Sequence, residues 1–366
     1  MMAVNKTKTW FKKNFIQLLT YALVIIGYIV MQTLSDGGQL TRAVKGYLVP
    51  ICSYIVLAIS LNLVVGISGE LSLGHAGFMG VGAFSGIVFA AVLSPVVADP
   101  FLRLVLSMLG GGVIAGLAGA IVGIPVLRLR GDYLAIVTLA FGEILKNIIG
   151  NLYIGLDGRG LTFGLSAEGV ALQEGGKMVV SGPLGATGVE KISTFFAGFL
   201  LILFTLFVVL NLIHSKEGRA IKAIRDNRIA AESVGINVTA FKMKAFVTGA
   251  FLAGMAGALY GLNMSGLQSS KFGFDTSIDI LVFVVLGGMG NILGSVISTV
   301  ILYLVPELLR ALQDLRMLLY AIVLILVMLF TWSPKVKMFT EAAKAKIGEK
   351  LTKIFRKKGK EADDNG

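Results

Sequence analysis

The chain has 366 residues, of which 55% are hydrophobic and only 15% charged, with a mean hydropathy of +0.83. Ordinary soluble domains carry about 25% charged residues, so this composition excludes a typical soluble protein and indicates a membrane protein. The net charge of +12 is compatible with nucleic-acid binding. However, the lysines and arginines gather in four short segments, as the positive-inside rule expects of cytoplasmic segments. We therefore expect a lipid bilayer and no nucleic acid as a partner.

Apolar runs of about 20 residues, the length that a helix needs to cross a bilayer, recur along the chain. They predict an all-α polytopic membrane protein. The first run follows four lysines, but it is too long and lacks the cleavage site of a signal peptide, so we interpret it as an uncleaved helix. The runs lie at 15–34, 47–66, 72–93, 102–124, 133–154, 192–213, 243–263, 276–304 and 315–333.

We expect no metal site and no nucleotide site in this chain. Cys52 is the single cysteine, which excludes an internal disulfide and a thiolate metal site, and we interpret it as a small buried hydrophobe. His75 has no second histidine or cysteine nearby in the sequence. The phosphate-binding pattern G-x-x-x-x-G-K-[ST] does not occur.

The positions of the basic segments, which should all lie on the cytoplasmic side, predict about ten membrane segments with both termini cytoplasmic. With the N-terminal tail 1–14 inside, the basic turn 127–133 and the segment 214–242 also fall inside. Single crossings by all the later runs would leave the basic tail 335–366 outside, against the rule. The run 275–305 is too long for one crossing, and we expect it to break into two half-helices or a re-entrant pair. The break falls at Gly287, Gly288, Gly290 and Asn291.

The transmembrane domain accordingly covers residues 15–334 and contains one long extracellular connection, 155–191. This connection is rich in glycine and shows no domain pattern, so we interpret it as a flexible surface loop. Two similar stretches, AGLAGAIVG at 115–123 and AGMAGALYG at 253–261, space small residues as helices that approach closely in lipid require. We interpret them first as sequences that let helices pack closely, and only second as evidence of an internal repeat.

The polar segment from residue 214 to 242 predicts a cytoplasmic helix. Ser215 is a suitable N-cap and Glu217 suits the first turn, so we expect one helix over 217–235, ended by Gly235. A solvated charged helix and a helix that docks on another protein are both compatible with the pattern. Its basic residues recur every three positions and give one basic face: Arg219, Lys222, Arg225 and Arg228.

Polar residues inside the apolar runs need a reason, because a charge at mid-membrane costs roughly 2.5–3.5 kcal/mol on insertion scales. Glu143 and Lys146 lie three residues apart, so we expect an ion pair, with Asn147 on the same helix face. This group either packs between helices or lies on the transport pathway.

A second polar group surrounds the break between the second and third runs. Broken helices in transporters expose backbone groups at the substrate site, so we place a candidate translocation path here. We interpret His75 as the cap of a turn, with substrate contact as the alternative. The candidate residues of the path are Asn62, Ser72, Gly74, His75, Glu143, Asn147, Gly288 and Asn291.

Four stretches together resemble one known family. They are SLNLVVGISGELSLGHAGFMGVGAF (60–84), RLRGDYLAIVTLAFGEILKNII (128–149), EGRAIKAIRDNRIAAESVGINVTAFKMKAF (217–246) and VVLGGMGNILGSVI (284–297). In this order they resemble membrane permeases of ATP-binding-cassette importers, specifically the branched-chain amino acid family and its LivM-type member. The two tails and the 155–191 connection contribute little to the resemblance.

The resemblance implies a transport subunit, not an enzyme, in a bacterial cytoplasmic membrane. In that family the permease has no cofactor or ATPase of its own, and ATP is used by two cytosolic subunits. A paralogous permease completes the pore, and an extracytoplasmic binding protein delivers a branched-chain or related hydrophobic amino acid. Carried onto this chain, the resemblance assigns ATPase coupling to Glu217, Arg219, Arg225, Asp226, Ala230, Ala231, Glu232 and Gly235.

Other classes of function stay open at this point. A permease for sugars, urea or short amides would share the architecture and differ only in substrate. An ion-coupled secondary transporter would need titrating membrane carboxylates, for which Glu70 and Glu143 are the candidates. A membrane-embedded enzyme is disfavoured, because we find no H-E-x-x-H motif, no catalytic pair of carboxylates at close spacing and no Ser/His/Asp order.

Overall fold

The computed structural model describes residues 2–308, apart from 39, 130, 167–168, 171 and 173–174, together with positions 318, 321–322, 325 and 329. The chain divides into two compact units, residues 1–302 and 303–366, and every contact given below lies within the first. The predicted run 315–333, except for isolated positions, and the basic tail 335–366 lie outside the described residues.

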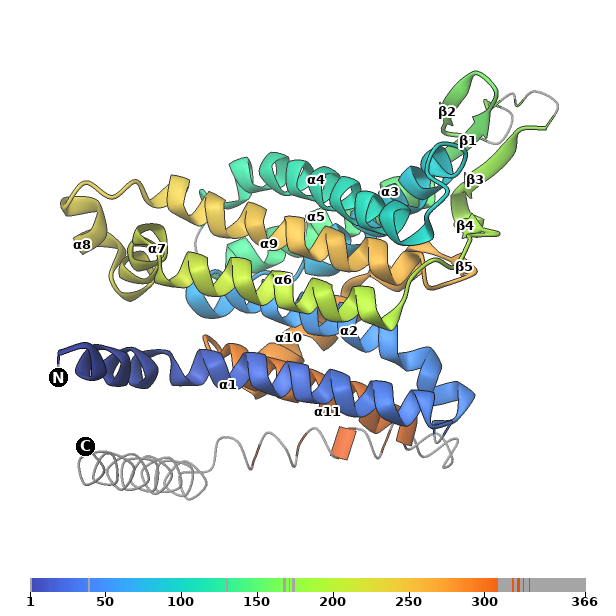
Figure 1. The fold of residues 1–366 in the computed structure, drawn as a ribbon. Coiled ribbons are helices and arrows are strands. Elements are labelled where there is room, and N and C mark those ends of the chain that lie inside the picture. The colour runs from blue at the N-terminus through green and yellow to red at the C-terminus, as the bar shows by residue number, and fades with distance from the viewer. Residues whose placement is uncertain are drawn as a thin grey trace. The chain divides into compact units, whose positions relative to one another are not determined.

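Within the described part of the chain, seven helices are long and apolar enough to cross a membrane. Each overlaps one of the predicted runs, so the prediction of a helical multi-pass membrane protein is confirmed (Figure 1). The seven helices are α1 (Met2–Asp36), α2 (Arg42–Asn62), α3 (His75–Leu93), α4 (Pro100–Val126), α5 (Asp132–Gly150), α6 (Phe195–His214) and α9 (Val238–Gly261).

The long run at 275–305 is broken where the glycines predict it. It forms α10 (Phe274–Gly287) and α11 (Ile292–Leu308), and the connection holds two glycines with positive φ, Gly288 at 93° and Gly290 at 83°. The Ser298 hydroxyl donates to the carbonyl of Phe283, so the two helices return side by side in opposite directions. The 14 residues of α10 rise only about 21 Å, which is shorter than the hydrocarbon core of about 30 Å.

Helices α3, α4 and α9 form the centre of the unit and pack through small residues. A Cβ placed on Gly82 of α3 would overlap the backbone of Gly254 in α9. A Cβ on Gly254 would in turn overlap the methyl group of Ala115 in α4. The two similar stretches noted in the sequence therefore face each other, and their small side chains let three helix backbones approach closely.

The connection at 155–191 is folded, and its interpretation as a flexible loop is wrong. It contributes four strands to an antiparallel sheet with the order β2-β1-β3-β4-β5, and the fifth strand follows α9. The sequence does contain one turn signal, because Asp157 precedes the turn residues Gly158 and Arg159 between β1 and β2, and its Oδ1 accepts from the Arg159 amide. The strands are β1 (Tyr153–Asp157), β2 (Gly160–Gly164), β3 (Lys177–Ser181), β4 (Ala186–Thr187) and β5 (Gly266–Leu267).

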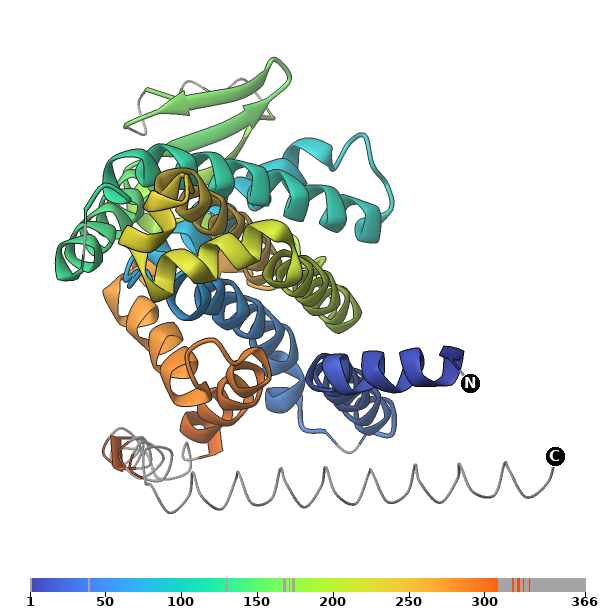
Figure 2. The same ribbon diagram turned by 90° about the vertical axis from the view of Figure 1, so that its left-hand side faces the viewer.

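The sheet and two short polar helices, α7 (Lys216–Asp226) and α8 (Arg228–Ser233), lie at opposite ends of the helix bundle (Figure 1). Figure 2 looks onto the end that carries α7 and α8. Helix α1 runs antiparallel to α6, because Gln17 contacts His214 and Tyr28 stacks on Phe199. Gln17 therefore lies at the same end of the bundle as α7.

Candidate translocation and coupling site

The two breaks in the membrane helices meet at Asn62. Helix α2 ends there and continues as a buried π-helical turn, Leu63–Ile67, before the chain turns into α3. The Asn62 side chain is fully buried, and its Oδ1 accepts a hydrogen bond from the Gly290 amide at 2.7 Å. Its Nδ2 donates to Ser295 Oγ at 2.7 Å. One amide thus fastens the end of α2 to the α10–α11 connection.

The same contact requires glycine on the π-helical turn. A Cβ on Gly66 would overlap both the Asn62 side chain and the Gly290 amide nitrogen. The positive φ of Gly290 also excludes most other residues on the facing side. The structure therefore brings the predicted path residues Asn62, Gly288 and Asn291 into one region of irregular backbone, which transporters use to present polar groups.

Gly74 and His75 fix the start of α3 next to this region. A Cβ on Gly74 would overlap the Thr138 carbonyl of α5, which explains the glycine. His75 is the first residue of α3, after the N-cap residue Gly74, and among the described residues its ring has one hydrogen-bond partner, which lies on α2. Its buried Nε2 lies 2.8 Å from Ser60 Oγ of α2. The interpretation of His75 as a turn cap is therefore wrong, because the ring ties α3 to α2.

Ser72 stands out among the predicted path residues. Its residue is 1% exposed, and its hydroxyl has no hydrogen-bond partner among the described residues. Buried hydroxyl groups are rarely left unpaired. Ser72 is therefore a buried hydroxyl with unused hydrogen-bonding capacity beside this break, and its assignment to a translocation path stays a prediction.

Glu143 and Asn147 belong to a different level of the bundle. The predicted ion pair between Glu143 and Lys146 is present, and Glu143 Oε1 also accepts from the amide of Phe274 at 2.9 Å. A carboxylate suits this position, because it lies at the positive N-terminal end of α10. Asn62, in contrast, holds the residues that follow the end of α10. The start of α3 links the two levels, because Gly74 packs against Gly142, the residue before Glu143, and the Ala76 amide donates to Ser277 Oγ of α10.

The polar segment after α6 is two helices, α7 and α8, instead of the expected single helix over 217–235. Ser215 caps α7 as predicted, with its Oγ accepting from the Gly218 amide at 3.1 Å. Asn227 is extended and caps α8, accepting from the Ala230 amide at 3.0 Å. Asparagine side chains compete with the helix for such bonds, so the helix breaks here. Arg228 does not continue the basic face of α7.

Arg225 carries the contact between this segment and the membrane helices. Its Nη1 donates to the Gly66 carbonyl of the π-helical turn at 2.9 Å. Its Cγ fills the space beside Gly69, where a Cβ would collide with it, and its guanidinium also pairs with Asp226. Of the predicted coupling residues, Arg225 therefore reaches the region where the two breaks meet.

The other predicted coupling residues divide into packing and surface positions. Ala231 is buried with Ile224 and Val238, in a small core beneath Ile236 and Phe241, so it holds the segment together. Glu217 pairs with Lys244 of α9. Exposed positions of the segment are Arg219, Asp226, Ala230, Glu232 and Gly235, to which the structure adds Ile229 and Val234.

Ile229 and Val234 were missed because the predicted helix had no break. With α7 and α8 separate, Ile229 is 80% exposed and Val234 is 74% exposed. Exposed aliphatic side chains beside charged ones, outside the membrane helices, are typical of a protein-binding surface. Their apolar type within a charged segment was the available signal in the sequence.

A second ion pair closes the same end of the bundle. Glu70 follows the π-helical turn, and its carboxylate pairs with Lys242 of α9. Both side chains are largely buried. They border a cavity of about 280 Å³ that also touches Gly69, Asp132 and Arg228. The cavity therefore connects the break before α3 with the polar helix α8.

Known proteins share this sequence over most of its length. Residues 43–328 match the family described as "Branched-chain amino acid transport system / permease component". The chain belongs to this family of transport permeases. This match spans α2 to α11 and includes both breaks and the α7–α8 segment.

Three curated relatives show the range of the family. LivM, the high-affinity branched-chain amino acid transport system permease protein of Salmonella typhimurium, is 35% identical over 293 residues, which are 77% of this chain and 67% of LivM. LivH, the high-affinity branched-chain amino acid transport system permease protein LivH of the same organism, is 24% identical over 68% of this chain and 79% of its own length. The fructose import permease protein FruG of Bifidobacterium longum is 25% identical over 81% of this chain and 85% of FruG. No solved structure matches the chain.

Proposed function

We propose that this permease is the membrane-spanning subunit of an ATP-driven importer for branched-chain or related hydrophobic amino acids. The observation that carries the proposal is the hydrogen bond from Arg225 to the Gly66 carbonyl. It links an exposed polar segment, suited to docking, with the place where the two helix breaks meet. Movement of α7 therefore changes the irregular backbone that we assign to the path.

Energy in this proposal comes from partner subunits, and the chain needs no cofactor of its own. Two cytosolic ATPase subunits dock on the exposed residues of α7 and α8, and an extracytoplasmic binding protein delivers substrate at the end that carries the sheet. A paralogous permease forms the second half of the pore. The similarity of the chain to both LivM and LivH, two permease proteins of one organism, supports such a pairing.

The proposed topology has ten membrane segments and cytoplasmic termini in the bacterial cytoplasmic membrane. The contact of Gln17 with His214 supports it, since it brings α1 to the α7 end of the bundle. A reporter fused after Lys360 tests it directly. Activity of a cytoplasmic reporter is expected, and activity of an extracytoplasmic reporter at the same position would exclude an even number of crossings.

Uptake by the reconstituted assembly tests the function. The chain, its proposed partner permease and ATPases, and the binding protein are placed in vesicles, and ATP-dependent uptake of labelled leucine is measured. Vesicles without this chain are the control. Uptake that needs an ion gradient instead of ATP would favour the secondary transporter. Because the relative FruG is named as a fructose import permease, uptake of fructose is measured in parallel. Uptake of fructose but not of leucine would replace the proposed substrate class with a sugar.

A further inference from the structure

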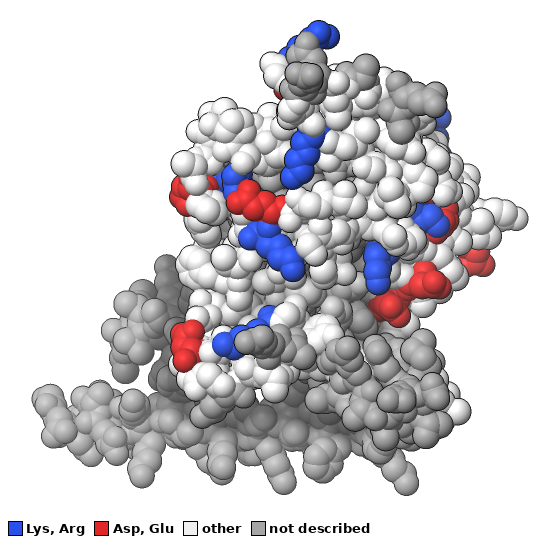
Figure 3. All heavy atoms as spheres, turned by 90° about the vertical axis from the view of Figure 1, so that its right-hand side faces the viewer, with Lys and Arg blue, Asp and Glu red and all other residues white. Residues whose placement is uncertain are grey.

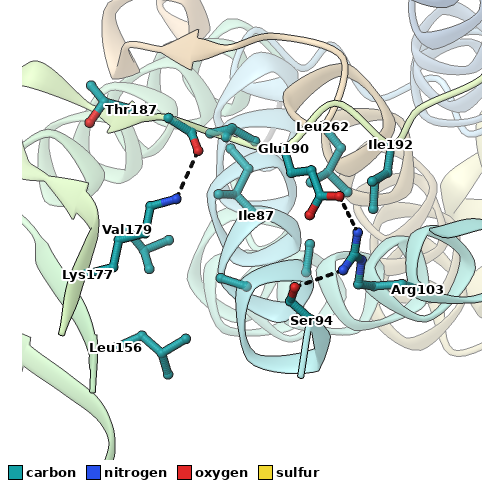
Figure 4. A pocket seen from close by; sticks show the side chains of 14 residues that line it. Ile87, Ser94, Arg103, Leu156, Lys177, Val179, Thr187, Glu190, Ile192 and Leu262 are labelled. Atoms are coloured by element: carbon teal, nitrogen blue, oxygen red, sulfur yellow. Dashed lines mark hydrogen bonds and ion pairs between the residues drawn. The ribbon is translucent and has the colours of Figure 1, made fainter. Parts of the chain in front are cut away.

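A cavity at the sheet end of the bundle has no role in the function described so far. It has a volume of about 170 Å³ and lies between strands β1 and β3 and the ends of α3, α4 and α9. Figure 4 shows Leu156, Lys177 and Val179 on the sheet side, with Arg103 and Glu190 across the cavity. Its volume is below the roughly 300–1,000 Å³ of pockets for drug-sized ligands, so it suits a molecule as small as one amino acid.

Arg103 is a buried cation with unused hydrogen-bonding capacity. Its residue is only 5% exposed, Nη1 donates to Ser94 Oγ at 2.9 Å, and Nη2 lies 2.8 Å from Glu190 Oε1. Its Nε is buried and has no acceptor among the described residues. Leaving a buried donor unpaired is unfavourable, and a guanidinium binds carboxylates well. The guanidinium has five N–H donors, and Nη1 and Nη2 each use one here, so Arg103 keeps donors for a carboxylate in the cavity that it lines.

The rest of the cavity complements the other parts of an amino acid. Glu190 brings a carboxylate, which binds an ammonium group, and Lys177 brings a second cation whose Nζ now donates to the Gly188 carbonyl at 3.1 Å. Ile87, Val179 and Ile192 form apolar walls. Figure 3 shows the face at this end, where charges of both signs lie scattered among uncharged residues. Such a mixture suits a zwitterion better than a polyanion.

We propose that this cavity is an outer binding site for a zwitterionic aliphatic α-amino acid. Arg103 binds the carboxylate, Glu190 binds the ammonium group, and the apolar walls contact the side chain. The site rests on the proposed function, in which it receives substrate before the path between the helix breaks. It lies at the opposite end of the bundle from Asn62 and Arg225 and is a separate site.

Protection of one cysteine from a thiol reagent tests the site locally. Thr187 is exposed and lines the cavity, so Thr187→Cys is introduced with Cys52→Ala, which removes the only native cysteine. The full chain is assembled with its partner subunits in lipid nanodiscs, without the binding protein. Leucine at ten times its dissociation constant leaves about one site in eleven empty. The modification rate at position 187 is then expected to fall about ten-fold.

The matched control is Lys191→Cys, since Lys191 is exposed and adjacent in sequence but does not line the cavity. Leucine should leave its modification rate unchanged. Adding Arg103→Gln or Glu190→Gln to Thr187→Cys should abolish protection. If these variants fail to fold, leucine analogues are used on the Thr187→Cys chain. 4-Methylpentanoate lacks the ammonium group and 3-methylbutylamine lacks the carboxylate, so each should protect less than leucine.

An unchanged rate at Thr187→Cys in saturating leucine would overturn the site, as would full protection in the Arg103→Gln chain or equal protection by all three compounds. Leucine uptake by the same Thr187→Cys chain, reconstituted in vesicles with its partner subunits and the binding protein, separates this result from failure of the proposed function. Uptake without protection removes the site and leaves the transport function standing. Protection without uptake supports the site and removes the transport function.

Discussion

Arg225 Nη1 lies 2.9 Å from the carbonyl oxygen of Gly66, and this hydrogen bond joins the polar helix α7 to the π-helical turn that follows α2. Gly66 in turn lies against the Gly290 backbone, and Asn62 binds the same Gly290 amide. A displacement of α7 therefore reaches both helix breaks through one side chain and two backbone contacts.

Charge reversal at Arg225 should uncouple ATP hydrolysis from uptake. Arg225→Glu removes the bond to Gly66 and places a carboxylate beside its carbonyl. A hydrogen bond from a charged donor is worth about 1.5–3 kcal/mol, and since the Arg225 side chain is 40% exposed, we take the lower end. Uptake per ATP hydrolysed should fall about ten-fold, with normal insertion, as measured in reconstituted vesicles.

Arg219→Glu is the matched control for Arg225→Glu. Arg219 is exposed on the same helix, and its Nη1 makes only a long contact of 3.4 Å to the His214 carbonyl. It should retain more of the coupling than Arg225→Glu. Equal coupling ratios in both variants and the unmodified chain would show that the contact to Gly66 carries no coupling.

Substitutions at an exposed and a buried position of α8 should distinguish a role in ATPase docking from a role in packing. Ile229→Asp places a charge on an exposed position, so it should reduce co-purification of the ATPase while the thermal stability of the permease stays unchanged. Ala231→Phe overfills the core with Ile224 and Val238, and overpacking costs about 1–3 kcal/mol. It should lower the melting temperature first. If Ala231→Phe instead keeps the melting temperature and loses the ATPase on co-purification, Ala231 belongs to the docking surface.

The elements with local signals were predictable from the sequence. Hydropathy gave the seven long helices, and the capping residue Ser215 marked the start of α7. Contacts between distant residues carried no such signal. Asn62 and Gly290 are 228 positions apart, and a single sequence indicates only that each lies near a break. The shared site follows from how α2, α10 and α11 fold back on one another.

The sheet and the α7–α8 break show a second limit. The strands of the sheet are short, and β5 begins at Gly266, far along the chain from its partner β4, which ends at Thr187. No continuous sequence pattern therefore predicts the sheet. At Asn227 the three-residue spacing of basic residues continues from Arg225 to Arg228 although the helix does not. The three-residue spacing of basic residues therefore did not predict the extent of the helix. The side-chain cap at Asn227 determines where α7 ends and α8 begins.

Adding a single methyl group at Gly66 should push the π-helical turn away from the α10–α11 connection. Gly66→Ala places a Cβ where the Gly290 amide lies, so the contact must open, and overpacking of this kind costs about 1–3 kcal/mol. Melting temperature and leucine uptake should both fall. Gly46→Ala in helix α2, which leads into this turn, meets nothing within 4 Å and should leave both unchanged. A Gly66→Ala chain with normal uptake would remove this contact from the mechanism.

The contributions of Glu70 and Lys242 to stability should depend on each other. The side chains are 12% and 9% exposed, and removing one partner of a buried pair costs about 3–5 kcal/mol because the other charge is left uncompensated. Glu70→Gln and Lys242→Gln should each destabilise the permease. The double variant leaves no unpaired charge and should be more stable than either single variant. This coupling is measured as a double-mutant cycle on the free energy of unfolding or on melting temperatures, and strictly additive losses would show that the two side chains act independently.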